Sequence, residues 1–287
     1  SSQAGEEESM ELEREEDEIV CLDETFFIND DYKLTKFSFG SHVLELFCLQ
    51  SACTDFDLTG QLVWPGATLL TDFLSKNEDM LKGCSVIELG SGVGVTGILC
   101  SKFCHQVVLT DHNEEILKRN IELHGSSNSA TSCEVVAEKL EWGNALQISK
   151  ILQRYSGGFD LVLGADIYIL TIYSSLFLIF KQALLCMHAC VYKLNYLKEI
   201  TVEAKFGTTC ISFQQSSIPL LFDTVGQLLS AKREKCKFLL AYVSRAKIMD
   251  TMVLKEAVMH GLQVREVVGT RSTVGNLEGV IFEMTLE

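Results

Sequence analysis

The feature that most constrains this chain is a glycine-rich turn between an apolar strand and a helix, within residues 86–97. The run reads Val-Ile-Glu-Leu-Gly-Ser-Gly-Val-Gly-Val-Thr-Gly. Gly90, Gly92 and Gly94 let the backbone take positive φ and let a ligand approach the main chain closely. The free N–H groups at the start of the following helix would face that ligand. The run therefore predicts a loop that binds a nucleotide-type cofactor.

Strands and helices alternate around this loop, which is typical of an α/β fold with a doubly wound, mostly parallel sheet. We expect strands at residues 85–89, 106–110, 132–138, 159–166 and 237–243. We expect helices at residues 67–81, 95–104, 114–124, 217–233 and 248–260. Two final strands, 262–268 and 279–286, have no helix between them, which favours antiparallel pairing.

The amino-terminal part differs from the rest of the chain in its charge. Nine acidic residues and Arg14 lie between Glu6 and Glu18, in a chain whose net charge is −15. We expect residues 1–18 to form an acidic, disordered tail, and residues 19–287 to form one domain. Short β-prone runs at 19–27, 33–39 and 42–48 predict a β-hairpin that precedes the main sheet.

Two classes of cofactor compete for the glycine-rich loop, and a purely structural turn is a third interpretation. Residues 92–97 also satisfy the dinucleotide pattern G-x-G-x-x-G, with Asp111 following in the chain. Glu88 favours the other class, because it adds an acid inside the strand and gives E-x-G-x-G-x-G. This form resembles motif I of class I S-adenosylmethionine-dependent methyltransferases.

Further motifs narrow the resemblance. They are Leu62-Val63-Trp64-Pro65-Gly66-Ala67, Leu109-Thr110-Asp111-His112-Asn113, Leu140-Glu141-Trp142-Gly143 and Gly164-Ala165-Asp166. Together they resemble the protein-lysine methyltransferase family that modifies calmodulin, elongation factors and chaperones, over residues 19–164 and again from residue 214. The resemblance implies a seven-stranded class I methyltransferase fold, S-adenosylmethionine as cofactor and a protein substrate that bears the target lysine.

The same resemblance implies a set of cofactor-binding residues. They are Trp64, Glu88, Gly90, Ser91, Gly92, Asp111, Trp142 and Ala165. Asp111, at the end of a strand, could accept hydrogen bonds from both ribose hydroxyls, and its alternative role is an N-cap of the next helix. The two tryptophans could pack on the adenine and the methionine end, or could serve core packing alone. Glu88 could support the loop, or be a buried acid satisfied by backbone N–H groups.

Asp166 and Tyr168 are the candidate catalytic residues, because they follow the fourth strand and could orient an acceptor amine. Methyl transfer needs a neutral amine, a dry channel and correct alignment more than strong acid–base groups. The family carries D-x-x-Y at this place, whereas this chain reads Asp166-Ile167-Tyr168-Ile169. Tyr168 therefore stands one residue early, and the sequence predicts cofactor binding more firmly than turnover.

Residues 170–213 interrupt the alternating pattern, since a short loop is usual between the strand and the helix on either side. Three interpretations remain: a membrane span near residues 170–192, a helical cap over the active site, and a non-native insertion such as a splice variant. We favour the insertion, because its removal would join Ile169 to Gln214 and restore an ordinary loop.

Alternatives to a lysine methyltransferase are a cofactor-binding protein without turnover and a methyltransferase for another acceptor. The acidic chain argues against nucleic-acid binding. We expect a monomer without a membrane anchor, located in the cytoplasm or in both cytoplasm and nucleus.

We expect reduced thiols and no metal, because the two cysteine–histidine clusters lack a C-x-x-C pair. These clusters are Cys100, Cys104 and His105, and Cys186, His188 and Cys190.

Overall fold

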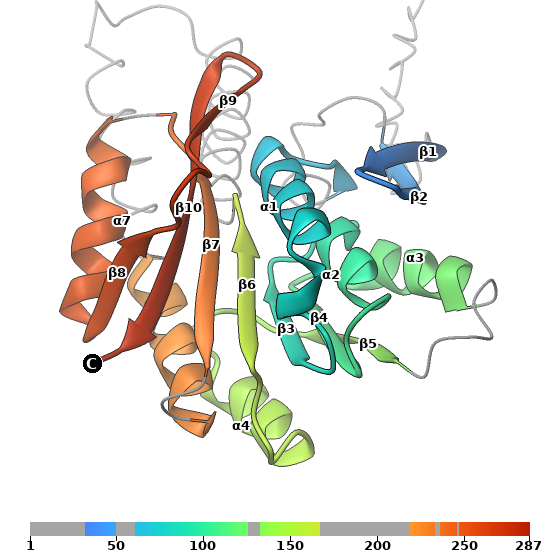
Figure 1. Ribbon diagram of the computed structural model, residues 1–287. Coiled ribbons are helices and arrows are strands. Elements are labelled where there is room, and N and C mark those ends of the chain that lie inside the picture. Colours follow the sequence, from blue (N-terminus) through green and yellow to red (C-terminus); the bar gives the residue numbers. More distant parts are fainter. Residues whose placement is uncertain (1–31, 50–60, 126–132, 167–217, 233–235, 246) are drawn as a thin grey trace, which may run out of the picture. The chain divides into compact units, whose positions relative to one another are not determined.

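A mixed β-sheet forms the middle layer of the fold (Figure 1). The computed structural model describes residues 32–49, 61–125, 133–166, 218–232, 236–245 and 247–287. The parallel strands are β3 (Ser85–Leu89), β4 (Gln106–Asp111), β5 (Glu134–Lys139), β6 (Leu161–Ala165) and β7 (Lys237–Val243). The antiparallel strands are β8 (Leu262–Glu266), β9 (Ser272–Val274) and β10 (Leu277–Leu286).

The strand order confirms the predicted doubly wound, mostly parallel sheet. It runs β5-β4-β3-β6-β7-β10-β8, and the short strand β9 pairs with β10 beside this path. The chain moves outward from β3 to β5, then returns to the other side of β3 with β6. Ligands bind at the carboxyl ends of the strands at such a switch point in open α/β sheets. The order therefore directs attention to the ends of β3, β4 and β6.

Helices cover both faces of the sheet (Figure 1). One face carries α1 (Pro65–Lys76), α2 (Val95–Cys100) and α3 (Glu115–Gly125); the other carries α4 (Ala145–Arg154), the helix over residues 218–232, and α7 (Lys247–Met259). Neighbouring strand residues point to opposite faces. On β6, Leu161 and Leu163 join the core under α1 and α2, whereas Val162 joins the core under α4 and α7. Both faces are buried, which explains the continuous apolar strands.

The predicted amino-terminal hairpin is confirmed for two of its three runs. β1 (Tyr32–Phe39) and β2 (His42–Leu49) pair antiparallel across a turn at Gly40, whose φ of 56° suits glycine. Asn120 of α3 ties this hairpin to the glycine-rich loop. Its side-chain oxygen accepts a hydrogen bond from the Phe47 N–H at 2.8 Å, and its amide donates to the Val93 carbonyl at 2.9 Å.

The first helix is shorter than the predicted helix over 67–81. It begins at Pro65 and ends at Lys76, and a separate 3-10 turn, η3 (Glu78–Met80), follows it. Asn77 interrupts the helix: its side chain donates to the Phe73 carbonyl at 2.8 Å, and its backbone N–H donates to Leu74 at 3.1 Å. Asparagine often competes with helical hydrogen bonds in this way.

Some of the predictions fall outside the described residues. They are the acidic tail 1–18, the β-prone run 19–27 and the segment 170–213 with its candidate membrane span. Each of them stays a prediction. Among the described helices, none has the length and apolar character needed to span a membrane.

Candidate functional site

The glycine-rich loop leads from β3 into α2, as the sequence predicts. Gly90, Gly92 and Gly94 have φ values of 63°, 54° and 85°, a region that side chains with a Cβ rarely adopt. Gly94 is also enclosed, because a Cβ built there would lie 2.6 Å from a methyl carbon of Leu117 on α3. The loop needs glycine for its backbone conformation and, at Gly94, for lack of space.

Ser91 fixes this loop against the neighbouring strand β4. Its backbone N–H donates to the Thr110 carbonyl at 2.9 Å, and its hydroxyl oxygen accepts a hydrogen bond from the Thr110 N–H at 3.0 Å. The hydroxyl also donates to the Glu88 carbonyl at 3.2 Å. The loop is thus held by several hydrogen bonds before any ligand arrives, which lowers the entropy cost of binding.

Glu88 lies inside the sheet, directly below this loop, and its residue is only 3% exposed. Its carboxyl oxygen accepts a hydrogen bond from the Gly97 N–H at 3.1 Å. Burial raises the pKa of Glu88 from 4.5 to about 7, although hydrogen bonds from Thr96, Gly97 and Ser91 act in the opposite direction. Glu88 is thus a buried acid that accepts a backbone hydrogen bond next to the loop. The two roles predicted for it, supporting the loop and being a satisfied buried acid, describe the same arrangement.

Asp111 ends β4 and faces the same loop, and it is 3% exposed. One carboxylate oxygen accepts a hydrogen bond from the Gly92 N–H at 2.8 Å. The other oxygen accepts a hydrogen bond from the Asn113 N–H at 3.2 Å, and it lies 2.8 Å from Nδ1 of His112. The N–H of Glu115, the first residue of α3, is bound instead by the Asn113 side chain at 3.1 Å. Asp111 is therefore oriented toward the loop more than toward the helix.

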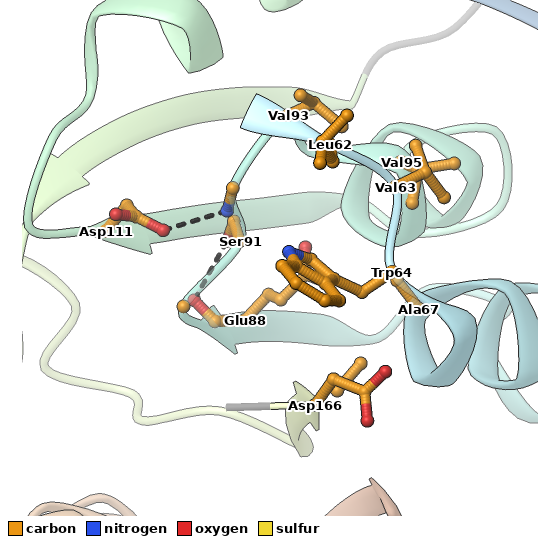
Figure 2. Close-up of a pocket in the computed structure, with 13 residues that line it drawn as sticks. Leu62, Val63, Trp64, Ala67, Glu88, Ser91, Val93, Val95, Asp111 and Asp166 are labelled. Atoms are coloured by element: carbon orange, nitrogen blue, oxygen red, sulfur yellow. Dashed lines mark hydrogen bonds between the residues drawn. The ribbon is translucent and has the colours of Figure 1, made fainter. Parts of the chain in front are cut away.

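These residues line one pocket, which Figure 2 shows at the carboxyl edge of the sheet. Its space, open side included, is about 480 Å³. The lining consists of Leu62, Val63, Trp64, Ala67, Glu88, Gly90, Ser91, Gly92, Val93, Val95, Asp111, Ala165 and Asp166. Apolar walls thus surround a floor of backbone amides and carboxyl groups.

Eight of the ten predicted site residues line this pocket, and two do not. The eight are Trp64, Glu88, Gly90, Ser91, Gly92, Asp111, Ala165 and Asp166. Trp142 follows β5 and packs, partly buried, against the core beneath α4 and α7; among the described residues it is not part of the pocket lining. Its contact with a cofactor stays a prediction. Tyr168 lies outside the described residues.

Asp166 forms the end of the pocket beside α1. In Figure 2 its carboxylate is directed toward the start of that helix, where it accepts a hydrogen bond from the Gly66 N–H. Arg245 donates to both oxygens of this carboxylate, at 3.1 and 3.3 Å. Sequence reasoning missed Arg245. A signal was present, because Arg245 follows β7 directly and the carboxyl ends of parallel strands meet at one edge of a sheet.

The apolar wall was also missed by sequence reasoning as a part of the site. Leu62 and Val63 precede α1, and Val93 and Val95 belong to the loop and the start of α2. Leu62 and Val63 belong to the same sequence motif as Trp64. The whole motif, and not the tryptophan alone, was therefore the signal for this wall.

The described cysteines are unpaired, and four of the six are buried. Burial raises the pKa of the Cys133 thiol to about 12, and hydrogen bonding and burial raise that of Cys100. In the described part of the chain no cluster of three potential metal ligands is present. The second predicted cluster, at residues 186–190, lies outside that part.

Comparison with known proteins points to one family. A profile of the family described as lysine methyltransferase matches residues 49–196, just over half of the chain. The chain is 33% identical over 138 residues to protein N-lysine methyltransferase METTL21A of Mus musculus, which is 47% of this chain and 57% of that protein. It is 39% identical over 107 residues to EEF1A lysine methyltransferase 3 of Xenopus tropicalis, covering 37% and 43% of the two chains.

A third relative is the protein-lysine N-methyltransferase EFM3 of Chaetomium thermophilum, with 35% identity over 116 residues, 38% of this chain and 33% of that one. The chain spans about half the length, or less, of these curated relatives. Among solved structures, magnesium protoporphyrin IX methyltransferase of Synechocystis PCC 6803 with bound SAM aligns with a TM-score of 0.45 and 13% identity, over 83% of this chain and 86% of that one.

Proposed function

This chain belongs to the lysine methyltransferase family, and from that membership we propose that it transfers methyl groups from S-adenosylmethionine to a lysine side chain of a protein. The observation that carries the proposal is the convergence of the glycine-rich loop, Glu88 and Asp111 on one pocket with Trp64 as its wall. The names of the relatives METTL21A and EEF1A lysine methyltransferase 3 support a protein as the acceptor.

The residues of the pocket fit the proposed cofactor in shape and in polarity. At Gly90 and Gly92 no side chain stands between the backbone and the pocket, so a ligand can approach the main chain closely. The walls of Leu62, Val63 and Val93 suit the apolar surface of a purine nucleoside, and the acids suit a ligand that carries an ammonium group.

Each polar residue then has a role that its position supports. Asp111 would hold the ribose hydroxyls, because a carboxylate accepts more hydrogen bonds than the three polar neighbours described here require. Gly90, Ser91 and Gly92 would hold the methionine moiety, and Ala165 would line the adenosine side. Trp64 would face the sulfonium end, where an aromatic ring stabilises positive charge.

When bound, S-adenosylmethionine supplies a methyl group made electrophilic by the sulfonium sulfur. The acceptor lysine must lose its proton before its nitrogen can form the new bond, and burial lowers the pKa of an amine. The apolar wall that includes Trp64 and Leu62 excludes water and so favours the neutral amine. Asp166, just after β6 and beside the start of α1, would orient the acceptor.

Three further properties belong to the proposal: action as a monomer, no use of nucleic acid and a cytoplasmic location. The unpaired cysteines among the described residues support a reducing compartment. The negative charge of the chain supports a basic acceptor protein and opposes binding to nucleic acid.

Calorimetry with S-adenosylmethionine, with NADH as a parallel titrant, tests the cofactor. We expect binding of S-adenosylmethionine alone; binding of NADH alone would overturn the proposal.

Incubation with labelled S-adenosylmethionine and cell extract, followed by mass spectrometry, tests the acceptor. We expect a methylated lysine on a protein. Cofactor binding without any methylated product would instead support a protein that binds the cofactor without turnover.

A further inference from the structure

Arg245 makes a contact beside the pocket, and this contact has no role in the proposed function. It lies just after β7, and its guanidinium donates from Nη1 to Oδ1 of Asp166 at 3.1 Å and from Nη2 to Oδ2 at 3.3 Å. This is a two-pronged pair, a geometry in which arginine cannot be replaced by lysine without loss. The Asp166 side chain is only 1% exposed, so water does little to weaken the pair.

Asp166 holds a third partner at the same carboxylate. The N–H of Gly66, in the first turn of α1, donates to Oδ2. A Cβ at Gly66 would lie 2.6 Å from the Asp166 carboxyl carbon, so the helix can approach this closely only with glycine. Asp166 itself has a φ of 51°, and among the described residues no other non-glycine residue has a positive φ. Such strain persists only where surrounding contacts impose it.

Arg245 also reaches the wall of the pocket and is itself held in place. Its guanidinium carbon lies 5.8 Å from the ring centre of Trp64, within cation–π range. Nη1 donates to the Val243 carbonyl at 3.2 Å. The residues on either side of Val243 are anchored to α7. The Tyr242 hydroxyl donates to Asp250 at 2.6 Å, and the Ser244 hydroxyl donates to it at 2.8 Å.

We propose that Arg245 is a positioning residue for the cofactor pocket. It holds the Asp166 carboxylate against the start of α1 and thereby fixes Trp64, the residue before that helix, as a wall. The inference rests on the proposed function for its effect on the cofactor, but the placement of Trp64 can be measured without any ligand. In this arrangement both oxygens of Asp166 are engaged within the protein, so its first task is to fix the wall.

The test compares Arg245→Gln and Arg245→Lys in a Trp142→Phe background, in which Trp64 is the remaining tryptophan. Arg154→Gln is the matched control, because Arg154 also pairs with a carboxylate, Glu138, and lies 5.6 Å from an aromatic ring, Tyr155, but neither of these partners lines the pocket. Fluorescence of the ligand-free proteins, well below their melting temperatures, reports Trp64. Calorimetry reports the dissociation constant for S-adenosylmethionine.

We expect Arg245→Gln to shift Trp64 emission and to weaken S-adenosylmethionine binding about tenfold or more, with Arg245→Lys intermediate and Arg154→Gln unchanged. The inference is overturned if Arg245→Gln only lowers the melting temperature and leaves both Trp64 emission and affinity at the values of the background protein. If the background protein and the wild type both fail to bind S-adenosylmethionine, the proposed function fails. The emission of ligand-free Arg245→Gln then still decides the inference.

Discussion

Glu88 places an ionisable group at a buried position, and this makes the stability of the protein depend on pH. Its pKa is about 7 in the folded protein, against an ordinary value of 4.5. Between these two pH values the folded protein keeps a proton that the unfolded chain has released. Stability therefore falls as pH rises through this window, and the loss is complete above about pH 7, with an upper limit of about 3 kcal/mol.

Glu88→Gln is expected to remove this dependence, because glutamine is neutral at every pH and its side-chain oxygen can still accept from the Gly97 N–H. Urea unfolding of both proteins at about pH 5 and pH 8 measures it. The wild type should lose about 1–3 kcal/mol more than the variant over this range. Equal losses in the two proteins would contradict the assignment. The helix-surface variant Glu122→Gln controls for the general effect of removing one acid.

Asp111→Ala tests the other acid of the pocket. The change removes the acceptor for the Gly92 N–H and the proposed ribose contact, and leaves a buried N–H without its present partner. We expect S-adenosylmethionine affinity to fall about tenfold to a hundredfold in calorimetry. Glu138→Ala is the control, since Glu138 pairs in register with Thr110 beside Asp111 but does not line the pocket. A comparable loss in both variants would count against a specific role for Asp111.

At the scale of elements, the packing of α2 against β4 depends on one glycine inside a helix. A Cβ at Gly97 would lie 1.9 Å from a methyl carbon of Leu109. Alanine ordinarily favours a helix over glycine by about 0.5–1 kcal/mol. We expect the opposite sign here: Gly97→Ala should destabilise the protein by about 1–3 kcal/mol, because the buried core cannot accept the added carbon.

The matched control is Gly226→Ala, in the helix over residues 218–232. A Cβ at Gly226 meets no atom within 4 Å, so this change should stabilise the protein by about 0.5–1 kcal/mol. Urea unfolding of both variants checks the pair. Two changes of the same sign would show that helix propensity, not the contact with Leu109, decides the effect at Gly97.

Most elements could be predicted because each carries its own local signal. The apolar run of β3, the glycines after it and the serine and proline before the helix at 218–232 need no knowledge of distant residues. The boundary of α1 depended on a competing hydrogen bond of Asn77, and β9 is a three-residue strand formed only by pairing with β10. Pairing of this kind leaves almost no trace in a short sequence window.

At the scale of the whole molecule, the acids and glycines of the site could be predicted and their partners could not. Asp166 and Arg245 stand 79 residues apart in the chain and meet only because β6 and β7 are neighbours. Trp142 follows β5 and packs, partly buried, against the core under α4 and α7, and its contact with a cofactor stays a prediction. Local position predicts which edge of the sheet a residue reaches, not which way its side chain turns.

If the acceptor is a basic protein, as proposed, the net charge of −15 predicts a salt dependence of its methylation. Attraction between an acidic enzyme and a basic acceptor weakens with ionic strength, so kcat/KM for the acceptor should fall about fivefold between about 50 and 300 mM KCl. The dissociation constant for S-adenosylmethionine should change by less than about twofold, because that pocket is largely buried. Deletion of residues 1–18, which carry most of the acidic excess, should flatten the salt dependence; an unchanged slope would exclude a role for them.

The position of β10 between β7 and β8 also sets the order in which this half of the sheet can be assembled during synthesis. The ribosome makes β7 and β8 first, yet both must wait for β10, which pairs antiparallel with each. Until then β7 keeps one open edge in an apolar strand, a state prone to wrong pairing. A nascent chain paused before residue 277 would therefore be a natural client for chaperones.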